Sequence, residues 1–406
     1  MKWTRGFAGR FEPRAVTAVV ALFALMVGIT GFAPASAETI DTSAPLEAKA
    51  PFDLQTPSYL LMEAKTGKVI FEKNADERRP VASVTKLMTI LLVLEELDRG
   101  VVKLTDSVFC SANAAGMGGS QALLDANVQY PLEELLKSTI VASANDSAVA
   151  LAEYLNGSED AFVKRMNDRA AQLGMTNTHY VNVTGLPAAN QYTSARDVAT
   201  VSRAVGQHPT FFKYSTIWMD SLKHPSGRVT DLTNTNRLIR FYEGADGFKT
   251  GSTNEAKYCL SATAARGSTR MIAVILGTPA SQTRFDEARK LLEYGFANYQ
   301  LNSLAKKGDL IGADVAVRLG AQSSVAAAVG SDVELLLGKG KERDLKLDVT
   351  LADTVPAPVR KGDVIGEVRV MLADELLMAL PAVAASDVPY PGYLEAIMQI
   401  LNNWKI

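Results

Sequence analysis

The segment that most constrains this chain is Ser83 to Leu94, where a serine and a lysine precede an apolar run. In a helix that begins near Ser83, a spacing of three residues places the Ser83 hydroxyl and the Lys86 amine on one face. The run from Leu87 to Leu94 is almost entirely apolar, which favours a buried helix. Burial favours a neutral lysine, and a neutral amine can be the base that a serine nucleophile needs.

The same pair of residues has an ordinary interpretation. Serine is a frequent helix N-cap, and a lysine three residues later is usually exposed on the helix surface. Two common residues at this spacing occur often by chance, so Ser83 and Lys86 need support from the rest of the chain.

The N-terminus predicts export. Four basic residues precede an apolar run over residues 15–32, and the small-residue site Ala35-Ser36-Ala37 follows it. This order is typical of a secretory signal peptide, which we place at residues 1–37. An uncleaved membrane anchor is the alternative, and the glycines of the segment and the Ala35–Ala37 site argue against it.

Composition excludes several functions. The chain has 406 residues with a formal net charge of −2, so there is no electrostatic case for nucleic-acid binding. Its three histidines lack the spacing of a zinc site, and we predict neither a metal nor a cofactor. Export permits a disulfide between Cys110 and Cys259, but both lie in apolar patterns, which favours two buried free thiols.

The hydrophobic pattern predicts several parts. Residues 38–56 form an extended leader, 57–300 a main domain, 301–388 a small β domain and 389–406 an amphipathic helix. In the main domain we expect a hairpin of residues 58–62 and 68–71 that turns at Gly67. We also expect helices over residues 132–140, 146–155, 158–173 and 284–299, a capped helix start at Ser194, and adjacent strands over 258–264 and 271–276.

The last helix has two interpretations. Leu394, Ile397, Met398, Leu401 and Trp404 form one apolar stripe, which can pack on the protein itself or lie in a membrane surface. Lys405 is the only basic residue after Gly392, so electrostatic attraction to lipid would be small. We favour the membrane surface.

Three short motifs follow one another along the chain: Ser83-x-x-Lys86, Ser143-x-Asn145 and Lys249-Thr250-Gly251. Each is weak alone, as Lys65-Thr66-Gly67 demonstrates: it repeats the third motif, but it precedes Ser83 and lies at the predicted hairpin turn. The order and context of the other three are specific.

In that order the motifs resemble those of penicillin-binding proteins and serine β-lactamases. Longer stretches, including residues 80–89, 194–197, 246–251 and 357–363, are similar to the D-alanyl-D-alanine carboxypeptidases among the low-molecular-mass penicillin-binding proteins. The resemblance covers residue 57 to the end. It implies an α+β fold with a β-lactamase/transpeptidase-like catalytic domain, in which helices and a helical subdomain flank an antiparallel sheet, followed by the β domain and the terminal helix.

The resemblance also implies roles for the motif residues. Ser83 would be the acyl-enzyme nucleophile, Lys86 its base, Ser143 a proton relay and Asn145 a substrate-positioning group. Lys249 and Thr250 would bind the terminal carboxylate of the substrate, Gly251 would let it lie along a strand edge, and the backbone N–H groups of Ser83 and Ser252 would form the oxyanion hole. The expected enzyme removes the terminal D-alanine from peptidoglycan stem pentapeptides and is acylated by β-lactams.

Two further functions compete with this one. A β-lactamase would need an efficient deacylating base, but the loop from Gly185 to Tyr192 contains no Asp or Glu. A non-catalytic sensor or scaffold would be free to lose Lys86 or Ser143, and both are present. Some carboxypeptidases of the family have His and Asp where this chain has Ser252 and Pro187, which leaves open how water is activated.

The resemblance and the signal peptide together give the expected location and partners. The protein would act in the periplasm or at the extracytoplasmic face of the cell membrane. Peptidoglycan stem peptides and β-lactams would bind at the motifs, and the terminal helix would attach peripherally to the outer face of the cytoplasmic membrane.

Overall fold

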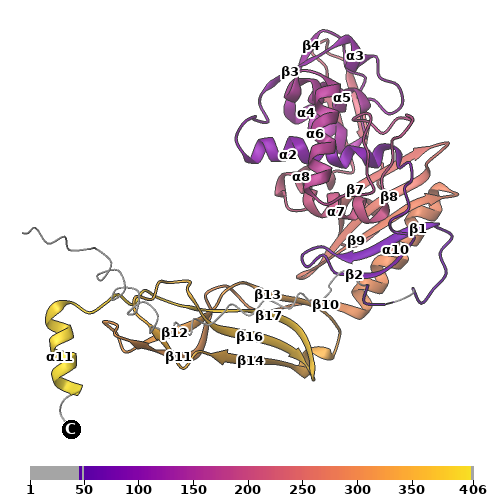
Figure 1. Ribbon diagram of the computed structural model, residues 1–406. Coiled ribbons are helices and arrows are strands. Elements are labelled where there is room, and N and C mark those ends of the chain that lie inside the picture. The colour runs from indigo at the N-terminus through magenta and orange to yellow at the C-terminus, as the bar shows by residue number, and fades with distance from the viewer. Residues whose placement is uncertain (1–44, 48–49, 404–406) are drawn as a thin grey trace, which may run out of the picture. The chain divides into compact units, whose positions relative to one another are not determined.

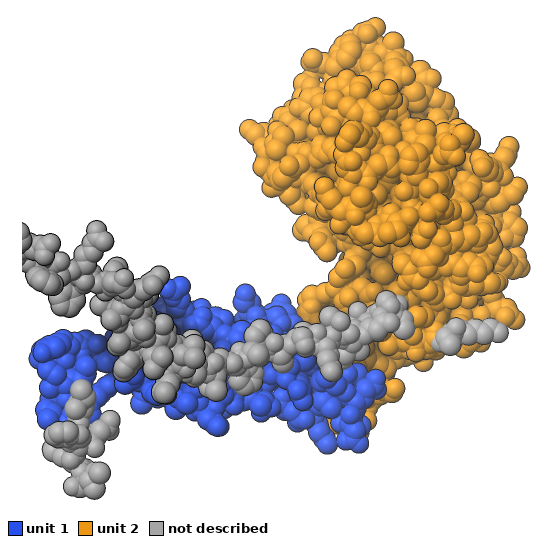
Figure 2. All heavy atoms as spheres, in the orientation of Figure 1, with its two compact units in different colours: residues 1–40, 305–332, 346–406 blue, residues 41–304, 333–345 orange. Residues whose placement is uncertain are grey.

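The computed structural model describes residues 45–47 and 50–403, so the predicted signal peptide and Trp404 lie outside the described residues. The chain divides into two compact units (Figure 2). The one we call the first unit, orange and labelled unit 2 in Figure 2, contains the described residues up to Leu304 together with Val333–Leu345. The second, blue and labelled unit 1 there, contains Ala305–Asp332 and the described residues from Lys346 onward.

A five-stranded sheet organises the first unit, in the order β2-β1-β9-β8-β7 (Figure 1). Its strands are β1 (Ser58–Glu63), β2 (Val69–Lys73), β7 (Ala245–Thr253), β8 (Lys257–Arg266) and β9 (Thr269–Thr278), all paired antiparallel. The predicted hairpin is confirmed: β1 pairs with β2, and Gly67 has the positive φ of 74°.

Both faces of this sheet are buried, which explains why β9 is almost continuously apolar. Met271, Ala273 and Ile275 enter one hydrophobic core, while the alternating residues Ile272, Val274 and Leu276 enter the other. Helix α10 (Ser281–Asn298) covers the first face, and α2 (Lys86–Asp98) and α7 (Ala195–Val205) cover the second.

A helical region completes the first unit. Its main helices are α4 (Leu132–Val141), α5 (Asn145–Asn156), α6 (Glu159–Gln172) and α8 (Pro209–Ser215), with the short α3 (Ala112–Ala115) and α9 (Leu238–Phe241). Hairpins β3–β4 (Ser107–Cys110, Val128–Pro131) and β5–β6 (Met219–Lys223, Val229–Thr233) border it. The predicted helices are confirmed, and Ser158 and Ser194 cap α6 and α7 as N-cap acceptors.

The second unit is a six-stranded sheet in the order β14-β16-β17-β12-β11-β15. Its strands are β11 (Leu310–Arg318), β12 (Ser324–Val329), β14 (Leu345–Leu351), β15 (Thr354–Pro356), β16 (Val364–Leu372) and β17 (Glu375–Ala384). We predicted one β domain over 301–388, whereas residues 333–345 group with the first unit. The reason is that β13 (Val333–Gly338) pairs with β10 (Tyr299–Ala305) and buries Leu336 in the core beneath α10.

Helix α11 (Tyr393–Asn403) follows β17 and keeps its apolar stripe exposed: Leu394 is 76% exposed, Met398 58% and Leu401 52%. No helix within the described part of the chain combines the length and apolar character needed to cross a membrane. Cys110 and Cys259 are both free and buried, as predicted.

Candidate active site

Ser83 lies in η1 (Ala82–Thr85), a single 3-10 turn that leads directly into α2. The predicted helix therefore begins three residues later, at Lys86, with Ser83 in the turn before it. The expected shared face is present, because the Lys86 Nζ lies 3.0 Å from the Ser83 Oγ.

Lys86 is fully buried, with no exposed surface. Its Nζ donates to the Thr184 carbonyl oxygen at 2.7 Å and to the Asn145 Oδ1. Burial holds the pKa of this amine well below its ordinary value, the charge of Lys249 lowers the pKa further, and Asp146 opposes both effects. In its neutral form the amine would donate its two N–H groups to these two oxygens, and its lone pair could then accept the proton of the Ser83 hydroxyl 3.0 Å away.

Ser143 and Asn145 lie where α4 ends and α5 begins. The Asn145 Nδ2 donates to the Gly118 carbonyl oxygen at 2.6 Å, which fixes the amide with its oxygen toward Lys86. Ser143 has a φ of 64°, and its Oγ is buried without a hydrogen-bond partner in the described part of the chain. A buried hydroxyl without a partner is unusual and is available to a bound molecule.

Asp146 holds this loop in place through hydrogen bonds to backbone N–H groups. Its carboxylate accepts hydrogen bonds from the backbone N–H groups of Ala122 and Leu124, each at 3.0 Å, and of Ser147 at 2.8 Å. These bonds tie α5 to the segment that follows Gly118, whose carbonyl orients Asn145. Asp146 thus fixes the position of the second motif although it does not contact Ser83.

The third motif lies on β7, the strand at the edge of the five-stranded sheet. Lys249 is 1% exposed and its Nζ contacts the Thr250 carbonyl oxygen at 3.4 Å. Burial, assisted by the charge of Arg284, lowers the pKa of Lys249 to about 7. The Thr250 Oγ1 donates to the Thr235 Oγ1 at 2.7 Å, which holds the strand against the loop before α9.

Gly251 brings β7 against η1. A Cβ at this position would lie 2.3 Å from the Val81 carbonyl oxygen and 3.0 Å from the Ser83 backbone nitrogen. Only a residue without a side chain permits this approach. The structure therefore brings Ser83, Lys86, Asn145 and Gly251 together, with Lys249, Thr250 and the exposed Ser252 on the same strand and Ser143 in the same loop as Asn145.

The second Lys-Thr-Gly triplet is placed elsewhere, in the turn between β1 and β2. Glu63 accepts hydrogen bonds from the Lys65 and Thr66 backbone N–H groups and from the Thr66 hydroxyl. This triplet closes a hairpin, as the sequence predicted.

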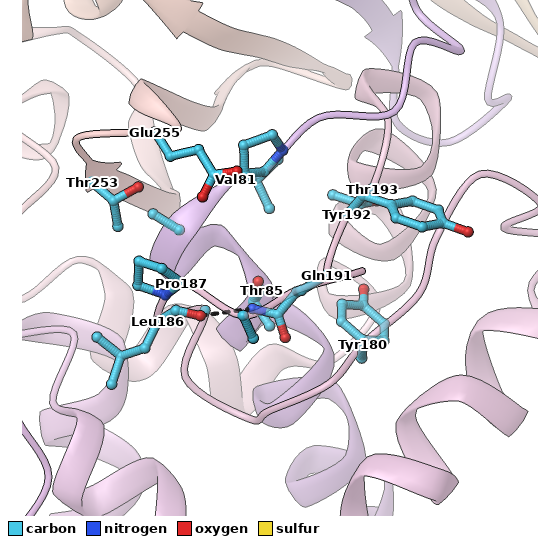
Figure 3. A pocket seen from close by; sticks show the side chains of 14 residues that line it. Val81, Thr85, Tyr180, Leu186, Pro187, Gln191, Tyr192, Thr193, Thr253 and Glu255 are labelled. Atoms are coloured by element: carbon cyan, nitrogen blue, oxygen red, sulfur yellow. Dashed lines mark hydrogen bonds between the residues drawn. The ribbon is translucent and has the colours of Figure 1, made fainter.

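A pocket opens on the side of η1 that faces the Gly185–Tyr192 loop (Figure 3). Val81 and Thr85 line it together with Leu186 and Pro187. Glu255, from the turn that follows β7, also lines this pocket. The loop itself supplies no acidic side chain, so the acid beside this pocket comes from a segment that the sequence analysis did not consider.

Four further groups hold the site and were not predicted from the sequence: Thr184, Thr235, Asp146 as a support, and Arg284. Arg284 could have been recognised from its position, because it shares one helical stripe with the apolar Ala288 and Leu291 at i+4 and i+7, and all three are buried in α10. A basic residue on the apolar stripe of a helix indicates a buried partner. No group of three or more His, Cys, Asp or Glu side chains among the described residues could hold a metal ion.

Comparisons with known proteins agree on one family. The sequence pattern described as D-alanyl-D-alanine carboxypeptidase matches residues 44–280, and that of the penicillin-binding protein 5 C-terminal domain matches residues 299–390. The chain is 37% identical to the D-alanyl-D-alanine carboxypeptidase DacF of Bacillus subtilis, over 86% of this chain and 90% of that one. It is 32% identical to DacC of Escherichia coli, over 86% and 88%.

Solved structures give the same result. Penicillin-binding protein 5 from Haemophilus influenzae superposes with a TM-score of 0.75 at 31% identity, covering 84% of this chain and all of that chain. Penicillin-binding protein 6B from Escherichia coli superposes with a TM-score of 0.69 at 29% identity, covering 84% and 99%.

Proposed function

Because the chain belongs to the D-alanyl-D-alanine carboxypeptidase family, we propose that its Ser83 forms the acyl-enzyme through which the terminal D-alanine of a peptidoglycan stem pentapeptide is removed. The observation that carries this assignment is the environment of Lys86. Its amine is buried, contacts the Ser83 hydroxyl, and has two carbonyl acceptors that suit its neutral form.

In the acylation step, the Ser83 Oγ attacks the carbonyl carbon between the two terminal D-alanines while the Lys86 amine accepts the hydroxyl proton. The resulting oxyanion is bound by the backbone N–H groups of Ser83 and Ser252. As the carbon–nitrogen bond breaks, the Ser143 hydroxyl gives its proton to the leaving amine and regains one from Lys86. D-alanine departs and the acyl group remains on Ser83.

Lys249 and Thr250 select a substrate with a free C-terminus. The substrate carboxylate accepts a charge-assisted hydrogen bond from Lys249, and the Thr250 hydroxyl donates to it after turning away from the Thr235 Oγ1. Gly251 lets the peptide lie along the free edge of β7, and Asn145 donates to the substrate amide with the N–H that Gly118 does not use.

In the deacylation step, water takes the place of the leaving amine. Its proton passes to the Lys86 amine, its oxygen attacks the ester carbonyl, and Ser83 is released with its hydroxyl restored. Penicillins enter the first step in the same way, because their amide carbonyl is attacked by Ser83, but their leaving nitrogen stays attached to the acyl group and hinders the water.

Intact mass spectrometry with benzylpenicillin, together with D-alanine release from a pentapeptide, tests the proposal. We expect a stable adduct on Ser83, D-alanine release, and loss of both in Ser83→Ala with the fold retained. Rapid adduct loss without peptide cleavage would instead identify a β-lactamase. Absence of both adduct and cleavage would exclude both enzymatic functions, and the non-catalytic sensor or scaffold would then be the remaining alternative.

For location, we propose export through the signal peptide of residues 1–37 and peripheral attachment of α11 to the outer face of the cytoplasmic membrane. Supporting this, the stripe of Leu394, Ile397, Met398 and Leu401 remains exposed on the protein surface. Flotation with lipid vesicles tests it: Leu394→Asp with Met398→Asp should abolish co-flotation, whereas Leu347→Asp, at an exposed leucine of β14, should not. Equal flotation of both variants would exclude the helix as the anchor.

A further inference from the structure

Arg284 is a buried cation for which no ion pair is present among the described residues. It lies in the first turns of α10 and is 8% exposed. Its guanidinium lies between the rings of Tyr258 and Phe285, 5.4 Å and 4.8 Å from their centroids. Its Nε is buried without a hydrogen-bond partner.

This placement is costly for folding. Burial is the main reason that the pKa of Arg284 falls to about 10, and the charge of Arg237 lowers the pKa further. A neutral or apolar side chain of similar size at this place would avoid the desolvation of a charge. A stabilising role therefore does not explain why a guanidinium is present.

The hydrogen bonds of Arg284 indicate what it does. Its Nη1 donates to the Gly251 carbonyl oxygen at 3.0 Å and to the Cys259 carbonyl oxygen at 3.3 Å. Gly251 and Cys259 are paired residues of β7 and β8, so the guanidinium bridges the two strands. It thus binds the side of β7 that faces the sheet interior.

The Gly251 carbonyl and the Ser252 N–H belong to one planar peptide group, in which they point in opposite directions. Since the carbonyl points toward β8 and Arg284, the Ser252 N–H points toward the free edge of β7. Beside that edge, η1 packs on one face of β7, where a Cβ at Gly251 would lie 3.0 Å from the Ser83 backbone nitrogen.

We propose that Arg284 is a positioning residue that fixes the Gly251–Ser252 peptide plane and polarises the Ser252 N–H as a donor to the oxyanion. A charged donor on the carbonyl oxygen draws electron density from the peptide group, which strengthens the hydrogen bond that its N–H donates. The effect is largest in the transition state, where the oxyanion carries its charge. This inference rests on the proposed function, because it needs the substrate carbonyl on Ser83.

A direct effect of Arg284 on the substrate carboxylate is the competing explanation, and one ligand separates the two. An N-acyl peptide that ends in the boronic acid analogue of D-alanine becomes tetrahedral on the Ser83 Oγ and occupies the oxyanion hole, but it has no terminal carboxylate. If Arg284 acts through the peptide plane, its loss weakens this boronate. If it acts on the carboxylate, the boronate binds as before.

The experiment compares wild type, Arg284→Gln, Arg284→Lys and Arg289→Gln, the last being an exposed arginine of the same helix. Removing a whole oxyanion donor costs about 10²–10³-fold in kcat, so losing its orientation and polarisation should cost about 10–100-fold. We expect that loss in kcat, in acylation by benzylpenicillin and in boronate affinity for Arg284→Gln, with KM changed less than about threefold. Arg284→Lys should recover part of it, and Arg289→Gln should match wild type.

Unchanged boronate affinity in Arg284→Gln would overturn the inference, as would a loss confined to KM. If Arg284→Gln does not fold, Arg284→Lys decides by the same readouts, since a defect in KM alone with normal boronate affinity would again contradict it. Failure of the proposed function is distinct: wild type itself would then form no penicillin adduct on Ser83.

Discussion

The close approach of β7 to η1 gives the sharpest prediction, the effect of Gly251→Ala. The added methyl group would lie 2.3 Å from the Val81 carbonyl oxygen, and both the Ser83 and Val84 backbone nitrogens would lie at 3.0 Å. Two of these three atoms belong to η1 and the third to the residue before it, so no flexible side chain can move aside.

The magnitude follows from that distance. An ordinary contact for a Cβ begins at 3.4 Å, so β7 and η1 must separate by about 1 Å. Misplacing reacting groups by about 1 Å costs about 10²-fold in rate, which corresponds to about 2.7 kcal/mol of activation free energy. Overpacking at a site of this kind typically lowers the free energy of unfolding by about 1–3 kcal/mol.

Stopped-flow acylation with a fluorescent penicillin measures the first quantity, and urea unfolding measures the second. Gly338→Ala is the matched control, because in the same unit a Cβ at Gly338 would meet only the flexible Lys341 side chain, at 3.6 Å or more. We expect this control to match wild type in both assays.

Gly251→Ala that acylates within threefold of wild type would refute the reasoning, since β7 and η1 would then not need their close approach. A variant that is folded and stable but slow would agree with it. A loss of rate seen equally in Gly338→Ala would show that strand glycines matter for another reason.

Three further predictions concern single groups. Replacing Ser143 by Gly removes a hydroxyl that has no partner among the described residues and suits the φ of 64°, so the free energy of unfolding should rise by about 1 kcal/mol. Pentapeptide turnover should fall at least about tenfold, because the proton relay is lost. A destabilised variant would contradict this. With a pKa of about 7, Lys249 loses its charge above that pH, so kcat/KM for the pentapeptide should fall above about pH 7 in wild type. Lys249→Arg keeps its charge and should not show this fall. Identical pH profiles would refute the assignment of Lys249 to the substrate carboxylate. His224 has a lowered pKa, mainly through burial and then through Arg228, and its Nδ1 is hydrogen-bonded to the Tyr130 hydroxyl. The unfolded state therefore binds the proton more readily, and the stability present above about pH 6.5 should be lost as pH falls. Urea unfolding at pH 7.5 and 5.0 should show a larger loss in wild type than in His224→Gln, and equal losses would contradict this.

Local sequence pattern is enough to predict many of the elements and the contact between Ser83 and Lys86. Hydrophobic periodicity places α4, α5, α6 and the paired strands β8 and β9, because these segments bury one stripe or two faces in any compact arrangement. The spacing of Ser83 and Lys86 is local, and their contact at 3.0 Å needs only one turn. The order of the three motifs was enough to reject Lys65-Thr66-Gly67.

Local pattern could not predict the groups that hold the site from a distance. Residues 333–345 look like part of the β domain, yet they group with the first unit, where Leu336 joins the core beneath α10. Thr184 and Thr235 contact Lys86 and Thr250 from loops that are 98 and 15 residues away along the chain, and nothing in their own sequence indicates these contacts.

Lys86 shows which properties follow from local sequence and which depend on the tertiary structure. Its sequence neighbours predict burial, and burial alone lowers the affinity of an amine for a proton. The directions of its two N–H groups depend on Thr184 and Asn145, which are 98 and 59 residues away. Only folding brings those two oxygens to one amine, because they come from segments far apart along the chain. The sequence therefore predicts a buried lysine beside Ser83, while the hydrogen-bond partners of its amine depend on the tertiary structure.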